Sequence, residues 1–214
     1  MTDIIDSIRK MVVSGKFREI EMEVQRAVNG GSDLNGLIND ALISAMDIVG
    51  KRFADGDIFV PEMLVSARTM KLGLEIIKPL LQSGEAEHRG TIVMGTVKGD
   101  LHDIGKNLVT MMLEGAGFKI IDLGVDMKIE TLLDTIKKGG VDVIGLSALL
   151  TTTMPEMENA IAALAEAGLR DQVKVIIGGA PIDQGFADQI GADGFGADAV
   201  EAVQLARELV AAEG

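Results

Sequence analysis

Apolar positions in the first 80 residues recur at the spacing of α-helices. In each of four segments, apolar side chains stand three or four positions apart, which places them on one face of a helix. Short glycine-containing breaks separate the first three segments. Helices of this length with short connections predict a small antiparallel four-helix bundle over residues 1–82. The four segments are residues 3–13, 16–28, 33–53 and 61–81.

The pattern changes after a polar stretch at residues 83–90, which we interpret as a linker. Beyond it, short apolar runs alternate with helical spacing, as in a domain of β-α units. The sequence therefore predicts, over residues 91–214, a flavodoxin-like (Rossmann-like) α/β domain with a doubly wound five-stranded parallel sheet in the order 2-1-3-4-5. The predicted strands are 91–96, 118–122, 141–146, 173–177 and 194–195. The predicted helices are 104–115, 128–138, 155–167, 183–189 and 198–211.

Composition removes several classes of function. The chain has no cysteine, which excludes disulfides, zinc-thiolate sites, iron–sulfur clusters and a thiol nucleophile. A formal charge of −13 repels phosphate backbones, so we expect no nucleic-acid partner. No apolar run approaches the roughly 20 residues of a membrane span, and no signal peptide is visible at the N-terminus. We therefore expect a cytoplasmic protein without a membrane partner.

Unusual residues follow the predicted strands at one edge of the sheet. In open α/β sheets, ligands bind at the carboxyl ends of the strands, near the point where strand order reverses. Each segment also has a structural interpretation, because a Gly-Gly pair forms turns and a run of hydroxyl side chains caps a helix. The segments are Lys98–Asn107 after strand one, Ser147–Thr153 after strand three, Gly178–Pro181 after strand four and Gly196–Ala199 after strand five.

His102 is the most informative of these residues. The chain has only two histidines, and the other, His88, lies in the predicted linker. Asp100 stands two positions before His102, and a carboxylate on one imidazole nitrogen orients the other for metal or proton chemistry. A zinc or iron site made of Asp100, His102 and Asp103 is one alternative, although no second histidine lies nearby.

Other flavodoxin-like functions fit the sequence poorly. A response-regulator receiver needs an aspartate at the end of strand three, where this chain has Ser147. It also needs a lysine after the last strand, where Gly196 and Ala197 stand. A flavodoxin phosphate loop would be rich in Ser and Thr after strand one, and the G-x-G-x-x-G pattern of dinucleotide folds is absent there.

Three ordered elements resemble those of cobalamin-binding domains. Asp100-Leu-His-Asp-Ile-Gly105 matches the D-x-H-x-x-G pattern, Ser147-Ala-Leu149 resembles its S-x-L element, and Gly178-Gly179 its G-G element. Residues 51–63 and 66–71 look like the helical cap of the same module. The chain thus resembles free-standing corrinoid proteins of the methyltransferase systems that demethylate methylamines, betaines, methanol or methoxyaromatics. The same module occurs in cobalamin-dependent methionine synthase.

The resemblance implies a set of site residues. His102 would be the lower axial cobalt ligand, with the benzimidazole of the cofactor displaced into the sheet domain. Asp100 would accept a hydrogen bond from His102, and Thr153 would end the relay. Phe53, Val60 and Met63 would cover the upper face of the corrin, although a place in the bundle core is the alternative for these three. The implied cofactor contacts are Gly99, Asp100, Leu101, His102, Asp103, Ile104, Gly105, Ser147, Leu149, Thr151, Gly178, Gly179 and Ala199.

The implied function is that of a methyl carrier without catalytic activity of its own. Cob(I)alamin would accept a methyl group from a substrate-specific methyltransferase that uses a methylated amine or a similar donor. Methyl-cob(III)alamin would pass the group to a second methyltransferase, which serves tetrahydrofolate or a thiol. A reductive activase would be a further partner.

Three alternatives stay open at this point. The small cobalamin-binding subunit of a mutase uses the same motif, but it pairs with a barrel and not with a four-helix cap. A cobalamin-sensing regulator would normally carry a DNA-binding or output domain. In a non-corrin metal or scaffold protein, His102 would have a structural role.

Overall fold

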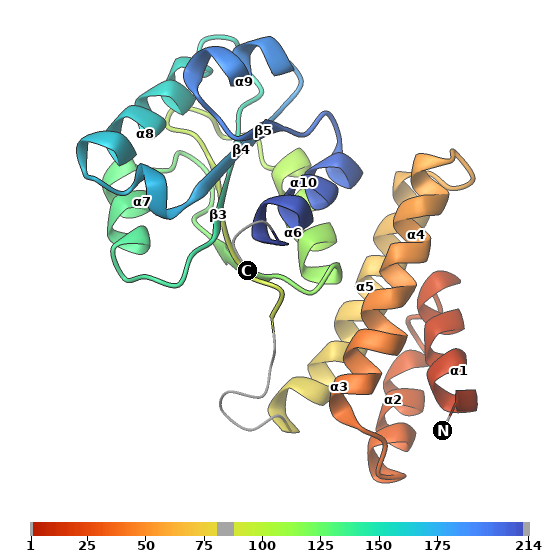
Figure 1. Cartoon of the computed structure of the whole chain (residues 1–214). Helices are drawn as coiled ribbons and strands as arrows, with labels where there is room; N and C mark the ends of the chain where they lie inside the picture. The colour runs from red at the N-terminus through yellow and green to blue at the C-terminus, as the bar shows by residue number, and fades with distance from the viewer. Residues whose placement is uncertain (1, 81–87, 212–214) are drawn as a thin grey trace. The chain divides into compact units, whose positions relative to one another are not determined.

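The computed structural model describes residues 2–80 and 88–211 (Figure 1). Most of the expected linker, at residues 83–87, lies outside the described residues. The chain divides into two compact units, residues 1–88 with 115–117, and residues 89–114 with 118–214. Among the helices that the structure describes, none combines the length and the apolar character needed to cross a membrane.

The first unit consists of helices, as expected. Helix α5 packs against α2, α4 and α1, and its Gly73 lets it approach closely, since a Cβ there would lie 3.1 Å from Leu42 Cδ2. Apolar side chains such as Ile20, Leu42 and Met70 form the core of this unit. The helical segments are α1 (Thr2–Val13), α2 (Ile20–Asn29), α3 (Leu34–Gly36), a π-helical turn (Leu37–Ile43), α4 (Ser44–Ala54), α5 (Val60–Ile77) and a 3-10 turn (Lys78–Leu80).

The π-helical turn divides the single helix expected over residues 33–53. At this turn the carbonyl oxygen of Asp40 accepts hydrogen bonds from Arg9 Nε at 3.0 Å and from the Ser44 hydroxyl at 2.6 Å. Side-chain donors that enter the ladder of backbone hydrogen bonds in this way are a known cause of local distortion in helices. The apolar spacing predicted the helix, but it carries no signal for these two polar contacts.

The second unit is built on a five-stranded parallel sheet in the order β2-β1-β3-β4-β5, which confirms the predicted topology. Helices α7, α8 and α9 bury their apolar residues against one face of the sheet, and α6 and α10 lie together in Figure 1. The strands are β1 (Thr91–Thr96), β2 (Lys119–Asp122), β3 (Val143–Ser147), β4 (Lys174–Gly178) and β5 (Gly194–Phe195). The helices are α6 (Ile104–Gly115), α7 (Ile129–Ile136), α8 (Pro155–Glu166), a 3-10 turn (Arg170–Gln172), α9 (Gln184–Ile190) and α10 (Ala199–Ala211).

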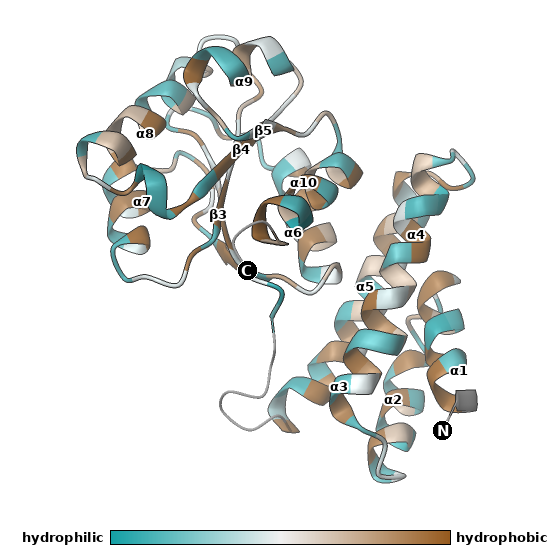
Figure 2. Cartoon of the chain, viewed as in Figure 1, coloured by the Kyte–Doolittle hydropathy of each residue, from teal (hydrophilic) through white to brown (hydrophobic). Residues whose placement is uncertain are grey.

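The predicted bounds of β1, β5 and α6 agree with the observed ones, whereas three strands begin later than predicted. Phe118, Val141 and Val173 were assigned to strands because they are apolar, and each is buried. They lie just before the strands they were assigned to, where they pack without belonging to the strand. Figure 2 shows the strands as a largely apolar layer between helices whose outer faces are more polar.

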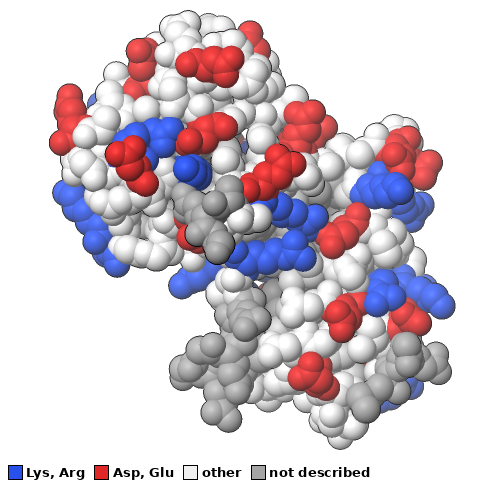
Figure 3. Space-filling view, in the orientation of Figure 1, with Lys and Arg blue, Asp and Glu red and all other residues white. Residues whose placement is uncertain are grey.

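Figure 3 shows the charged side chains on one face of the protein. In the face drawn in Figure 3, acidic and basic side chains are interspersed on both units. The acidic side chains on that face do not form one continuous patch.

Candidate functional site

The loop between β1 and α6 carries the candidate site. Strand β1 ends at Thr96 and helix α6 begins at Ile104, so the loop lies at the carboxyl edge of the sheet, next to β3. Within this loop Asp100 is completely buried, whereas 51% of the His102 side chain is exposed. Asp100 Oδ1 lies 2.7 Å from His102 Nδ1 and accepts the backbone N–H of His102 at 3.0 Å.

The other oxygen of Asp100 is bound to the loop that follows β3. Asp100 Oδ2 accepts the Thr153 hydroxyl at 2.8 Å and the backbone N–H groups of Leu149 and Leu150 at 2.8 and 3.3 Å. Residues about 50 positions apart in the sequence therefore meet on one carboxylate. Because a buried carboxylate needs hydrogen-bond donors on both oxygens, this arrangement fixes the two loops to each other.

The hydrogen bonds of Asp100 also determine its charge. Burial by itself would raise the pKa of this carboxyl, since it disfavours the ionised form. Hydrogen bonds from Leu149 N–H, His102 and Thr153 outweigh that effect, and they hold the pKa of Asp100 well below its usual range. Asp100 is therefore a fixed anion over the ordinary pH range.

A fixed anion beside Nδ1 decides which nitrogen of His102 is available. An ionised carboxylate only accepts hydrogen bonds, so Nδ1 of His102 carries a proton and donates it. In the neutral imidazole the lone pair is then on Nε2, the nitrogen that is free to bind a metal ion. The backbone carbonyl of His102 accepts a hydrogen bond from the buried Thr96 hydroxyl at 3.0 Å, which anchors the same residue from the other side.

Apolar side chains are exposed around His102. Leu101 and Ile104, its neighbours in sequence, are 70% and 86% exposed. Leu149 and Leu150 direct their N–H groups to Asp100, and their own side chains are exposed. In the described part of the second unit, the exposed large apolar side chains all stand on or next to the loops after β1, β2 and β3. Apolar surface of this kind is typical of a ligand site.

The glycine pair after β4 has a structural reason. Gly178 is the last residue of β4, and a Cβ on it would lie 3.1 Å from the carbonyl oxygen of Gly196. Gly179 has a φ of +139°, and a Cβ there would overlap the carbonyl oxygen of Ala148. Only glycine fits at position 179, because the loops after β3 and β4 approach each other closely.

The remaining predicted contacts are distributed along the same edge. Gly99 precedes Asp100, and Gly105 lies in the first turn of α6. Ser147 is the half-buried last residue of β3, Thr151 is exposed in the loop that follows, and Ala199 is the buried first residue of α10. These residues do not take part in the hydrogen bonds to Asp100.

The metal site proposed from Asp100, His102 and Asp103 is wrong. Asp103 Oδ2 accepts a hydrogen bond from Asn107 at 3.0 Å, while both oxygens of Asp100 are occupied by the donors described above. Within residues 2–80 and 88–211, no three His, Cys, Asp or Glu side chains come together as metal ligands would. If His102 binds a metal ion, the ion has to bring its remaining ligands with it.

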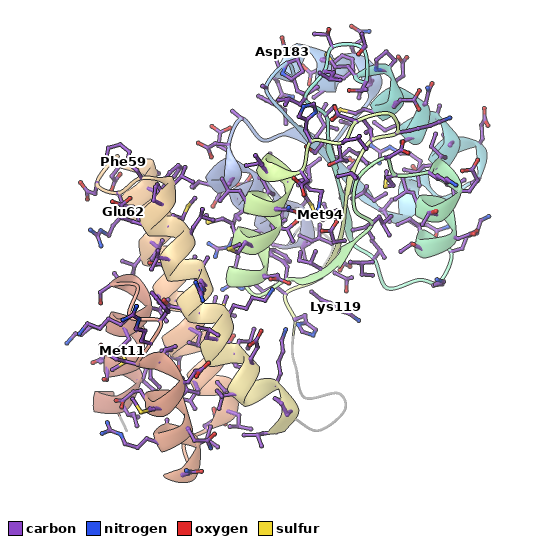
Figure 4. The ribbon with its side chains drawn as sticks, turned by 180° about the vertical axis from the view of Figure 1, so that it is seen from behind. Met11, Phe59, Glu62, Met94, Lys119 and Asp183 are labelled. Atoms are coloured by element: carbon purple, nitrogen blue, oxygen red, sulfur yellow. The ribbon has the colours of Figure 1, made fainter. Side chains whose placement is uncertain are left out.

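The three predicted cap residues differ in exposure within the helical unit. Met63 is completely buried, Phe53 is half-buried and Val60, the first residue of α5, is 39% exposed. Phe59 lies in the same segment but was not among the three predicted residues. It is 68% exposed directly before α5, and its N–H donates to Glu62 Oε2 at 3.1 Å (Figure 4). A large aromatic residue in a polar loop was the signal that could have found it.

An ion pair, also missed in the sequence, joins α6 to β2. Lys106 Nζ lies 2.5 Å from Asp122 Oδ2 and donates to Asn107 Oδ1 at 2.9 Å. The Lys106 side chain is only 2% exposed, whereas that of Asp122 is 38% exposed. Asp122 Oδ1 also accepts the N–H of Gly124, so this pair fixes the first turns of α6 to the end of β2.

Comparisons with known proteins agree on one family. Two models described as B12 binding domains match residues 90–204 and 4–78. A corrinoid protein of Desulfitobacterium hafniense is 40% identical over 210 residues, 97% of each chain. Dimethylamine corrinoid protein 1 of Methanosarcina acetivorans is 41% identical over 210 residues, 98% of each chain. A chain in the crystal structure of the methanol:cobalamin methyltransferase complex MtaBC of Methanosarcina barkeri is 32% identical, with a TM-score of 0.88. That match covers 98% of this chain and 80% of the other.

Proposed function

The chain belongs to the B12-binding family of methyltransferase-cognate corrinoid proteins, and on this premise we propose that it carries a methyl group from one methyltransferase to another. Its cofactor is a corrinoid. The observation that carries the proposal is the exposed imidazole of His102, whose Nδ1 is held at 2.7 Å by the buried Asp100. This arrangement offers one oriented nitrogen ligand and no others.

The residues at this edge of the sheet fit a corrinoid. A corrin ring would bring its own nitrogen ligands to its cobalt, so the protein would need to supply only one more, and His102 offers such a nitrogen among the residues described at this edge. The exposed side chains of Leu101, Ile104 and Leu149 suit the apolar periphery of such a ring. A metal ion that brought no ligands of its own would find no complete set of protein ligands among the described residues.

When bound, the corrinoid supplies a cobalt ion that accepts and releases a methyl group. In the proposed mechanism, His102 would hold this ion through Nε2, while Asp100 would keep the proton on Nδ1 and so strengthen the imidazole as a ligand. Because its pKa is held low, Asp100 stays ionised and would keep the proton on Nδ1 of His102. Thr153 stabilises that charge through its hydroxyl on Oδ2.

The partners follow from the same proposal. A substrate-specific methyltransferase would supply the methyl group from a methylated amine or a similar donor, as supported by the similarity to a dimethylamine corrinoid protein and to a chain of a methanol methyltransferase complex. A second methyltransferase would take the group to tetrahydrofolate or a thiol, and a reductive activase would restore a cofactor that has become oxidised. Phe53, Val60 and Met63 stay proposed as residues that cover the upper face of the corrin.

Reconstitution with hydroxocobalamin tests the proposal. We expect the wild-type protein and a His102→Gly variant to bind corrinoid in equal amounts, measured as cobalt per chain. We expect the visible spectrum of the variant to differ, because the axial nitrogen is lost, and its rate of methyl transfer to fall. A wild-type protein without bound corrin, or a variant with an unchanged spectrum, would contradict the proposal.

A further inference from the structure

Asp126 has an unusual backbone conformation in the loop between β2 and α7. Among the described residues it is the one non-glycine residue with a positive φ, at +50°. Aspartate tolerates this left-handed region better than most residues, but glycine adopts it with less strain. Such a strained conformation persists only where contacts with the surrounding structure hold it, so the contacts of the Asp126 side chain are informative.

Those contacts lie in the loop that carries the cobalt ligand. Asp126 Oδ1 accepts the backbone N–H of Gly99 at 2.7 Å, and the backbone N–H of Asp126 donates to the carbonyl oxygen of Asp100 at 3.0 Å. Gly99 itself has a φ of +78°, and the Asp100 N–H bonds to the Val97 carbonyl at 3.1 Å. Asp126 thus holds the chain on both sides of the Asp100 α-carbon.

The position of this α-carbon controls the direction of His102. The carboxylate of Asp100 binds both the ring and the N–H of His102, so a shift in the Asp100 backbone moves the imidazole with it. A ligand must be held within about 0.5 Å of its productive position by its supporting residues. Two side chains outside the loops after β1 and β3 contribute to this support. The Thr96 hydroxyl binds the carbonyl of His102, whereas the Asp126 carboxylate binds the N–H of Gly99 on the other side of Asp100.

We propose that Asp126 is a positioning residue for the axial ligand, which fixes the loop after β1 so that His102 Nε2 keeps the orientation that cobalt ligation requires. This inference rests on the proposed function, since it concerns how His102 is held for ligation. Its distinctive consequence is that one substitution changes stability and ligation in different directions. Glycine at position 126 relieves the backbone strain, which favours the stability of the fold. It also removes the bond to Gly99, so His102 is held less firmly.

The test compares three variants loaded with hydroxocobalamin under the same conditions. Asp126→Gly keeps the backbone conformation and the bond to Asp100 but removes the acceptor for Gly99. Asp126→Asn keeps an acceptor oxygen and serves as the conservative variant. Asp33→Gly is the matched control, because Asp33 accepts the N–H of Gly36 at the same distance, 2.7 Å, in the helical unit. The readouts are cobalt per chain, the fraction of cofactor with the His-ligated visible spectrum, the Tm and the exchange rate of the Gly99 amide in the protein without cofactor.

For Asp126→Gly we expect unchanged cobalt content, an equal or higher Tm and faster exchange of the Gly99 amide. We also expect the equilibrium between ligated and unligated His102 to shift about fivefold toward the unligated form. A shift of this size corresponds to the loss of about one net hydrogen bond. Asp126→Asn should restore most of the ligated fraction, and Asp33→Gly should leave it unchanged. If wild type has the His-ligated spectrum and Asp126→Gly has the same ligated fraction, this inference fails alone. If wild type lacks that spectrum, the proposed function itself has failed.

Discussion

Two pairs of an acidic and a basic side chain lie near the same edge of the sheet, one in the loop after β1 and one between α6 and the end of β2. In one pair the acid is buried, and in the other the base is buried. In the first pair the acid, Asp100, is completely buried and the base, His102, is 51% exposed. In the second pair the base, Lys106, is 2% exposed and the acid, Asp122, is 38% exposed. In both, the buried member has further hydrogen bonds that hold it in place.

The difference shows why one pair is suited to a ligand and the other to structure. The exposed member of the first pair has a nitrogen left over, since Asp100 occupies only Nδ1 of His102. In the second pair, both oxygens of the exposed Asp122 are occupied. Oδ2 contacts Lys106, and Oδ1 accepts the N–H of Gly124. Burial of the acid therefore leaves an imidazole nitrogen available at the surface, whereas burial of the base connects α6 to β2.

Replacing the buried acid should have the largest effect. In Asp100→Asn the amide nitrogen cannot accept hydrogen bonds, so the donors on Oδ2 or those on Oδ1 lose their acceptor. We expect the free energy of unfolding to fall by about 3 kcal/mol and the His-ligated spectrum to be largely lost. Denaturant unfolding of the protein without cofactor, and the spectrum of the reconstituted protein, measure the two effects. Full retention of both would show that Asp100 does not organise the site.

The same comparison has a defined pH dependence. The pKa of Asp100 is lowered in the folded protein from an ordinary value of 3.8, so its stabilising effect is complete above that value and is lost as the pH falls toward the folded pKa. The stability difference between wild type and Asp100→Asn should be constant from about pH 7 to about pH 5 and should shrink below about pH 4. A difference that grew on acidification would have the wrong sign for this account.

Removing the exposed acid of the second pair should have an intermediate effect. Asp122→Ala leaves Lys106 buried with Asn107 as its remaining partner. We expect a loss of about 2 kcal/mol in the free energy of unfolding, below the usual cost of breaking a buried pair because Asp122 is partly solvated. The spectrum of the bound corrinoid should not change. A changed spectrum at full cobalt content would mean that the second pair also supports the ligand.

Removing the buried base should have the smallest effect. Lys106→Met replaces the buried ammonium by an apolar group of similar length and leaves Asp122 in contact with water. We expect a loss of about 0.5 kcal/mol, because the cost of breaking such a pair comes from leaving a charge buried without a partner, and the charge left here, on Asp122, is partly solvated. Thermal unfolding beside Asp122→Ala measures the order of the two variants. If Lys106→Met were the less stable variant, this would contradict the expectation that Lys106 without its partner costs more than Asp122 without its partner.

The fold was predictable because alternation of strand and helix patterns determines a parallel sheet and its topology. Strand β1 and helix α6 were predicted with their observed bounds. Three strand starts were misplaced because Phe118, Val141 and Val173 are buried without belonging to strands. The π-helical turn at Leu37–Ile43 was not predicted, since it depends on contacts from Arg9 and Ser44 to one carbonyl.

The candidate site was predictable where it depends on short spacing or on a motif. Asp100 and His102 are two positions apart, and the resemblance to cobalamin-binding domains implied Thr153. The positive φ of Asp126, the burial of Lys106 and the approach of Gly179 to Ala148 arise from contacts between loops. Such contacts leave no periodic pattern in the sequence, which explains why these features were not predicted.

The central claim is that a histidine nitrogen of this chain binds the cobalt. It is tested most directly by electron paramagnetic resonance of the reconstituted protein, reduced to the cobalt(II) state, after growth with and without ¹⁵N-labelled histidine. An axial ¹⁴N nucleus splits the cobalt lines into triplets and an axial ¹⁵N nucleus into doublets. We predict triplets from the unlabelled protein, doublets from the labelled protein, and neither from His102→Gly. Triplets in the labelled protein would place the benzimidazole nitrogen on the cobalt and contradict the account.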